Sequence, residues 1–133
     1  MVAKPLPDLS PLVCVVEPDA DVREFLVHIL ENQGYRCEGF VSAERFQSSP
    51  AQAAASCVIV DADLPGKNGL DLAREVHRSE RPVPVMLLAP EPDRELLDQA
   101  RSAAVARVQV KPIKSISEFL QAVASAIAFA AML

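Results

Sequence analysis

The 133-residue sequence lacks the features that mark several broad classes of protein. Its three cysteines are an odd number with no Cys-x-x-Cys pair, which argues against a disulfide framework and a zinc site. No apolar run reaches about 18 residues, and the start "MVAKPLPDLSP" lacks the apolar segment of a signal peptide. The net charge of -5 argues against direct nucleic-acid binding, which needs clustered Lys and Arg. We therefore expect a soluble, cytoplasmic protein with no direct nucleic-acid or membrane partner.

The balance of hydrophobic and charged residues is that of a folded domain. Hydrophobic residues make up 50% of the chain and charged residues 23%, which argues against disorder. A chain of 133 residues is long enough to bury a core as one domain. We expect residues 1–11, which are rich in proline, to form a flexible tail, and residues 12–133 to form the domain.

Apolar runs and helical patterns alternate along the chain. Strands are predicted where apolar and β-branched residues cluster, at residues 12–16, 35–41, 57–60, 83–89 and 106–110. Helices are predicted between and after them, at residues 21–33 and 43–48, around Leu72, Ala73 and Val76, at residues 93–102, and from Ser115 onward. This alternation predicts an α/β fold, a three-layer α/β/α sandwich around a five-stranded parallel sheet with right-handed crossovers.

Local signals mark the ends of the first and last helices. Asp21 and Glu24 form an Asp-x-x-Glu capping pattern, and Gly34 is suited to end the first helix. Ser115 and Glu118 form a capping pattern at the last helix. The positions predicted to be buried are Val22, Phe25, Leu26, Ile29 and Leu30 in the first helix and Ile116, Phe119, Leu120, Val123 and Ile127 in the last.

Acidic and basic residues follow three of the predicted strands. "EPD" with Glu17 and Asp19 follows the first strand, Asp61 follows the third, and Lys111 follows the fifth. One such residue alone is most simply a solvated turn residue. In parallel sheets, however, the carboxyl ends of the strands share one edge, and ligands bind beyond that edge. We therefore expect Glu17, Asp19, Asp61 and Lys111 to converge in one shallow cleft.

Two motifs give these residues a resemblance to a known family. "VDADLPGKNGLDL" resembles the stretch around the phosphoacceptor aspartate in receiver domains of two-component response regulators, and "VKPI" resembles the family's lysine and its cis-proline. The resemblance covers about residues 12–128. It implies a flavodoxin-like strand order of 2-1-3-4-5, Asp61 as the phosphoacceptor, and Lys111 as the partner of the phosphoryl oxygens.

The resemblance also implies a cofactor and partners. Mg²⁺ would use Asp61, the backbone carbonyl of Asp63 and an acid after the first strand, either Glu17 or Asp19. A histidine kinase or a phosphotransfer protein would supply the phosphoryl group, and the domain would be a signalling module rather than an enzyme. Signalling would use the face made by the helix at residues 93–102, the strand at 106–110 and the last helix.

The sequence departs from the receiver pattern at several positions. Pro18 stands where receivers usually have a second acid, and Ala89 stands where they have Thr or Ser. Val108 replaces an aromatic residue that is frequent three positions before the lysine, and Ala104 stands where glycine is common. Alanine cannot donate a side-chain hydrogen bond, and valine cannot switch between the packed positions of an aromatic ring. The active site is therefore degenerate in this comparison.

Two hypotheses follow from these departures. In the first, Asp61 is still phosphorylated but the signal to the usual output face is weakened or rewired. In the second, the chain is a pseudo-receiver that docks a partner protein without phosphorylation. Both agree with the sequence, because allostery requires contacts that differ between two states and two of the family's contacts are missing.

Three further segments of the sequence have alternative interpretations. "DAD" at Asp61 also resembles haloacid-dehalogenase-type phosphatases, but in that family the motif follows the first strand. "PGKNG" is not a P-loop, and Lys67 and Asn68 are interpreted as exposed turn residues. The apolar residues Phe129 and Met132 would either cover a second subunit in a homodimer or begin a linker to an output domain.

Overall fold

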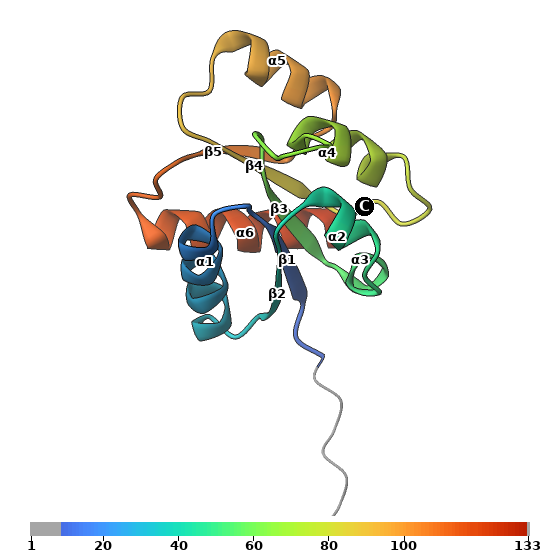
Figure 1. Ribbon diagram of the computed structural model, residues 1–133. Coiled ribbons are helices and arrows are strands. Elements are labelled where there is room, and N and C mark those ends of the chain that lie inside the picture. The colour runs from blue at the N-terminus through green and yellow to red at the C-terminus, as the bar shows by residue number, and fades with distance from the viewer. Residues whose placement is uncertain (1–8, 133) are drawn as a thin grey trace, which may run out of the picture.

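A computed structural model describes residues 9–132, so residues 1–8 of the predicted tail and Leu133 lie outside the described residues (Figure 1). The strands are β1 (Leu12–Val16), β2 (Arg36–Phe40), β3 (Cys57–Asp61), β4 (Val85–Ala89) and β5 (Arg107–Val110). The helices are α1 (Ala20–Asn32), α2 (Ala43–Gln47), α3 (Ala51–Ala54), α4 (Gly69–His77), α5 (Arg94–Ser102) and α6 (Ile116–Ala131). The five strands form one parallel sheet in the order β2-β1-β3-β4-β5, which confirms the predicted fold class and strand order.

The sheet separates two hydrophobic cores. One face packs against α1 and α6, through residues such as Leu26 and Phe119. The other face packs against α2, α3, α4 and α5, with Phe46 and Leu72 among its buried residues. Figure 1 shows the resulting three layers, with α1 and α6 on one side of the strands and α2, α4 and α5 on the other.

Burial explains the composition of the strands. Every residue of the three central strands β1, β3 and β4 is buried, as expected for strands covered on both faces. The edge strands β2 and β5 are partly exposed, and they contain polar residues. In the parallel register Asp61 lies opposite Leu88, so β3 ends on a carboxylate beside the end of β4.

The ends of the helices confirm some predictions and correct others. Ser115 caps α6 by accepting a hydrogen bond from the backbone N–H of Glu118, as predicted, and Gly34 follows α1 with a positive φ of 103°. The predicted Asp21 and Glu24 capping pattern is wrong, because Asp19 caps α1. Asp19 has extended backbone geometry directly before the helix, where its carboxylate reaches the first free N–H groups.

Two predicted core residues lie at the surface. Phe25 is 42% exposed and Ile116 is 43% exposed, although both fit the apolar stripes of their helices. Ile116 is the first residue of α6. Phe25 lines an apolar groove of about 530 Å³ together with Leu88, Ile113 and Lys111.

The connection from β2 to β3 holds two short helices, where the sequence predicts one. Pro50 disfavours helical geometry in the residue before it, so α2 ends at Gln47 and α3 starts at Ala51. Ser49 accepts a hydrogen bond from the backbone N–H of Ala51 across this break. Near the start of the described chain, Arg36 donates to the backbone carbonyls of Ser10 and Pro11, which ties these residues to β2.

Candidate functional site: an acid–lysine cluster at the carboxyl edge

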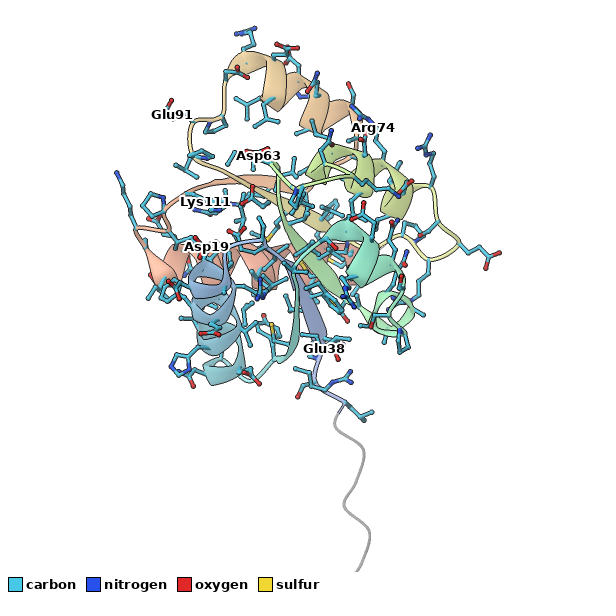
Figure 2. The ribbon with its side chains drawn as sticks, in the orientation of Figure 1. Asp19, Glu38, Asp63, Arg74, Glu91 and Lys111 are labelled. Atoms are coloured by element: carbon cyan, nitrogen blue, oxygen red, sulfur yellow. The ribbon has the colours of Figure 1, made fainter. Side chains whose placement is uncertain are left out.

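Three side chains from three strand ends meet at the carboxyl edge of the sheet. Glu17 directly follows β1, Asp61 ends β3, and Lys111 directly follows β5. The Lys111 Nζ donates to Glu17 Oε1 at 2.5 Å and to Asp61 Oδ2 at 2.6 Å. Figure 2 shows Lys111 in this region, between the labelled Asp19 and Asp63. We call Glu17, Asp61 and Lys111 the acid–lysine cluster.

The cluster is largely withdrawn from solvent. The side chain of Glu17 is fully buried, that of Asp61 is 8% exposed and that of Lys111 is 21% exposed. Glu17 Oε2 is buried without a hydrogen-bond partner among the described residues. Burying an unpaired carboxylate oxygen is costly, so this atom marks a position that is suited to a further positive charge or donor.

The pKa values reflect this burial. Burial, and then the neighbouring Asp61 carboxyl, raise the pKa of Glu17 to about 7, although Lys111 opposes the shift. Burial acts to lower the pKa of Lys111, but its hydrogen bonds to Asp61 and Glu17 outweigh burial and the pKa is raised. Lys111 therefore stays charged at neutral pH, and Glu17 lies near the midpoint of its titration.

Backbone contacts fix the direction of the Asp61 side chain. The backbone N–H of Asp63 donates to Asp61 Oδ1 at 2.8 Å, while Lys111 holds Oδ2. The backbone N–H of Ala62 donates to the carbonyl of Leu88 at 2.9 Å, which joins the start of the loop to β4. Gly69 is needed at the end of this loop, because a Cβ there would lie 2.4 Å from the backbone oxygen of Asp61.

Of the predicted acidic side chains, only Glu17 and Asp61 come together. Asp19 is exposed, and its Oδ1 accepts hydrogen bonds from the backbone N–H groups of Asp21 and Val22. Pro18 has no side-chain oxygen to contribute. Glu17 is held by its backbone, since its N–H donates to the carbonyl of Phe40 and its carbonyl accepts from Arg23 Nη1 at 2.7 Å.

The donor set can be compared with the needs of Mg²⁺. Within residues 9–132, no group of three or more His, Cys, Asp or Glu side chains is arranged to hold a metal ion. Mg²⁺, however, is usually held by one or two carboxylates while water completes its coordination. Glu17, with its unpaired Oε2, and Asp61 fit that requirement, and the backbone carbonyl of Asp63, two residues after Asp61, is the predicted third ligand. Mg²⁺ binding by these residues stays a prediction.

The altered positions lie beside the cluster. Ala89 ends β4 and is buried, and its carbonyl accepts a hydrogen bond from the backbone N–H of Lys111 at 2.9 Å. Val108 in β5 is partly buried against the core that contains α4 and α5. The peptide bond between Lys111 and Pro112 is cis, as the resemblance implies.

Sequence analysis missed the polar contacts that hold the loop after Asp61. Lys67, interpreted from the sequence as exposed, is partly buried and bonds to Glu75 and Gln47. Asn68 is exposed as predicted, and its side chain also caps α4. Gln47 comes from α2, which lies 20 residues before Lys67 in the chain, so no local spacing signals this contact.

No helix within residues 9–132 is both long enough and apolar enough to cross a membrane.

Curated relatives of the chain are bacterial regulators. The chain is 30% identical over 116 residues to the transcriptional regulatory protein PdtaR of Mycobacterium tuberculosis, covering 86% of this chain and 56% of that protein. It is 29% identical over 115 residues to nodulation protein W of Bradyrhizobium diazoefficiens, covering 86% of this chain and 50% of that protein. The chain thus spans about half the length of the curated relatives that it matches.

Solved structures and a family model complete the comparison. The non-phosphorylated HemR receiver domain from Leptospira biflexa matches with a TM-score of 0.79 and 26% identity, covering 89% of this chain and 94% of that one. Chemotaxis protein CheY4 of Vibrio cholerae shares the fold, with a TM-score of 0.82 and 18% identity over 88% of this chain and 98% of that one. The family model described as the response regulator receiver domain matches residues 13–124. Together with the parallel sheet and the acid–lysine cluster, this match shows that the chain belongs to the response regulator receiver domain family.

Proposed function

We propose that this domain accepts a phosphoryl group on Asp61. Receiver domains are signalling modules of two-component systems, and they generally bind Mg²⁺ in an acidic pocket. The observation that carries the proposal is the position of Lys111, whose ammonium group bonds to both Asp61 and Glu17 at the ligand-binding edge of the sheet. A lysine there can neutralise phosphoryl oxygens on Asp61 without moving far.

The chemistry of the step follows from the side chains. A carboxylate oxygen of Asp61 attacks the phosphorus of the donor, and the bond between phosphorus and the donor's leaving atom breaks. The product is an acyl phosphate on Asp61, and the leaving group departs with the electron pair of the broken bond. Lys111, and Mg²⁺ when it is bound, supply positive charge for the phosphoryl oxygens. In the cell the donor would be the phosphohistidine of a histidine kinase or of a phosphotransfer protein.

A second part of the proposal concerns the face through which a signal leaves the domain. We propose that any signal leaves through the face made by α5, β5 and α6, either to a second copy of the chain, to an output domain or to a separate protein. The exposed Phe129 and Met132 near the end of α6 support an apolar partner on that helix. The chain spans about half the length of its curated relatives, which supports an output domain as one candidate partner.

A second function is favoured by specific observations. Pro18 contributes no oxygen, Asp19 is engaged in capping α1, and Ala89 has no hydroxyl. These features support a pseudo-receiver that docks a partner without phosphorylation. A phosphatase activity, suggested only by the order of Asp61 and Asp63, has no further support in the described residues, and turnover of a chromogenic phosphate would revive it.

The two proposals are separated by intact-mass measurement after incubation with acetyl phosphate and Mg²⁺. The phosphoacceptor proposal predicts the added mass of one phosphoryl group in the wild type and none in Asp61→Asn. It also predicts that chelation of Mg²⁺ lowers incorporation. No incorporation at high donor and Mg²⁺ concentrations would contradict it and favour the pseudo-receiver.

A further inference from the structure

The loop after the acceptor is held on its outer side by a polar triangle around Lys67. The Lys67 Nζ donates to Glu75 Oε2 at 2.6 Å and to Gln47 Oε1 at 2.8 Å. Gln47 Nε2 closes the triangle by donating to the same Glu75 oxygen at 2.7 Å. Because Gln47 belongs to α2 and Glu75 to α4, Lys67 joins the loop at residues 62–68 to two helices.

The backbone of the same loop also contacts α2. The backbone N–H of Lys67 donates to Glu44 Oε1 at 3.0 Å. Gly66, with φ of 72°, lets the chain turn toward this carboxylate, and a Cβ at Gly66 would lie 3.0 Å from Glu44 Oε1. The hydrogen bond from Lys67 lowers the pKa of Glu44, and Lys67 and Gln47 lower the pKa of Glu75, so both acids are ionised at neutral pH.

The other end of this loop contacts the acceptor. The backbone N–H of Asp63 bonds to Asp61 Oδ1, and Ala62 bonds to the end of β4. Between the two attached ends, Leu64 is buried in the core. The loop is therefore fixed beside Asp61, in the core and at α2. Because only Leu64, Pro65 and Gly66 separate Asp63 from Lys67, a displacement at Lys67 is transmitted along the backbone to the Asp63 peptide.

The partial exposure of Lys67 and Glu75 indicates that their ion pair acts on the loop rather than on the stability of the whole domain. The side chains of Lys67 and Glu75 are 29% and 40% exposed, and ion pairs of this kind contribute little to overall stability. The Lys67 ammonium is also neutralised by Glu75, so it is poorly placed to act as a free basic contact for a phosphodonor. Its remaining role is to restrict the loop.

We infer that Lys67 is a positioning residue for the acceptor site: it holds the loop at residues 62–68 against α2 and α4, and so keeps the Asp63 peptide in place beside Asp61. Its consequence for phosphoryl transfer rests on the proposed function. The restriction of the Asp63 peptide by Lys67 is a geometric claim and does not rest on the proposed function.

The first test measures the loop directly, without metal or phosphodonor. Amide hydrogen exchange followed by NMR is compared in the wild type, Lys67→Met, Lys67→Arg and Lys114→Met. Lys114 is exposed, so Lys114→Met reproduces the charge change at another loop. We expect the Asp63 amide to exchange several-fold faster in Lys67→Met, partial restoration in Lys67→Arg, and no change in Lys114→Met. Unchanged exchange at Asp63 in Lys67→Met would overturn the inference.

The second test measures Mg²⁺ dependence with acetyl phosphate as donor. We expect Lys67→Met to raise the Mg²⁺ concentration for half-maximal incorporation several-fold, with little change in melting temperature. A lower melting temperature with unchanged Mg²⁺ dependence would show a merely structural role and would contradict the inference. If the wild type incorporates no phosphoryl group, the proposed function fails, and amide exchange alone decides the role of Lys67.

A second variant covers the case in which Lys67→Met fails to fold. Gln47→Leu removes one corner of the triangle from α2 and leaves the loop sequence and the net charge unchanged. Faster exchange at the Asp63 amide in Gln47→Leu would support the inference. Exchange equal to that of the wild type would count against it.

Discussion

The carboxyl edge of the sheet has two halves that differ in chemistry. In one half, Glu17, Asp61 and Lys111 join the ends of three strands through two short charged hydrogen bonds. In the other half, Ala89 and Val108 occupy the positions at which receivers, by resemblance, have a hydroxyl and an aromatic ring. By resemblance, the receiving half keeps Asp61 and Lys111 but has Pro18 in place of one acid, and the second half, which would report the phosphoryl group, lacks both the hydroxyl and the aromatic ring.

Packing differs between the two halves as well. The two acids of the cluster lie at the ends of the fully buried strands β1 and β3, whereas Val108 lies in β5, which is partly exposed. Of the residues in α5 only Ala100 is buried, and Leu97 is 43% exposed. The comparison teaches that a receiver fold can keep a cluster suited to phosphoryl acceptance at its strand ends while other positions of the receiver pattern change.

Replacing Lys111 with methionine is expected to have the largest effect on stability. It leaves Glu17 and Asp61 close together in a buried site without their shared cation. Removing one partner of a buried ion pair is strongly destabilising, and Lys111 is only partly exposed, so we expect the free energy of unfolding to fall by about 3–4 kcal/mol at pH 8. Urea denaturation measures the change. Lys114→Met is the control, and equal losses in both variants would contradict the role of Lys111.

Glu17→Gln is expected to stabilise the metal-free protein at high pH. The pKa of Glu17 is raised from 4.5 to about 7, so the folded state holds this proton more tightly than the unfolded state. The stability linked to this proton is therefore complete below about pH 4.5 and is lost as the pH rises to about 7. Glutamine does not titrate, so we expect a gain of about 2–3 kcal/mol over the wild type at pH 8 and none at pH 4.

Urea denaturation at the two pH values, followed by Mg²⁺ addition, completes this test. Mg²⁺ is expected to stabilise the wild type more than Glu17→Gln at pH 8, because the variant lacks one carboxylate. A gain in Glu17→Gln that is equal at pH 4 and pH 8 would contradict the titration of Glu17 as its cause.

Ala89→Thr tests whether the missing hydroxyl limits the response of the half that contains Ala89 and Val108 to a phosphoryl group at Asp61. Ala89 is buried, so the added hydroxyl is expected to cost about 1–2 kcal/mol in the resting protein. Beryllofluoride with Mg²⁺, a tetrahedral mimic of the phosphoryl group, should recover most of that loss by accepting the hydroxyl's hydrogen bond. Ala89→Val has nearly the same shape without the hydroxyl. Thermal unfolding that shows equal recovery in both variants would argue against a hydrogen bond.

Ala104→Gly is expected to have the smallest effect, and it concerns the connection from α5 to β5. Ala104 has φ of 59°, a left-handed conformation that costs a residue with a Cβ about 1 kcal/mol. We expect Ala104→Gly to raise the free energy of unfolding by that amount and to leave phosphoryl incorporation unchanged. Ala124→Gly, at an exposed position within α6, should instead lower stability by about 1 kcal/mol. The same sign in both variants would disagree with this account.

The sequence predicts the fold and the centre of the site well. The sequence predicts that Glu17, Asp61 and Lys111 converge, because parallel strands end at one edge, and the structure brings these three together. The sequence also predicts that Asp19 joins them, but its carboxylate accepts hydrogen bonds from the free N–H groups of α1. Spacing along the chain does not reveal which of two competing partners a carboxylate takes.

Contacts between distant segments escape sequence analysis for a related reason. Lys67 meets Gln47 only because α2 and the loop after Asp61 lie on the same side of the sheet. Phe25 fits the helical apolar pattern, but it faces a groove beside Lys111 rather than the core. In both cases the side chain's environment depends on neighbouring elements, and a local pattern carries no information about them.

The central claim is that the acid–lysine cluster accepts a phosphoryl group, while the half of the carboxyl edge that contains Ala89 and Val108 does not respond to it. The most direct measurement is the change in backbone amide NMR shifts when beryllofluoride and Mg²⁺ are added to the wild type, with Asp61→Asn as control. The account predicts large changes near Glu17, Asp61 and Lys111, small changes at Val108 and along α5, and none in the control. Equally large changes at Val108 and throughout α5 would contradict it.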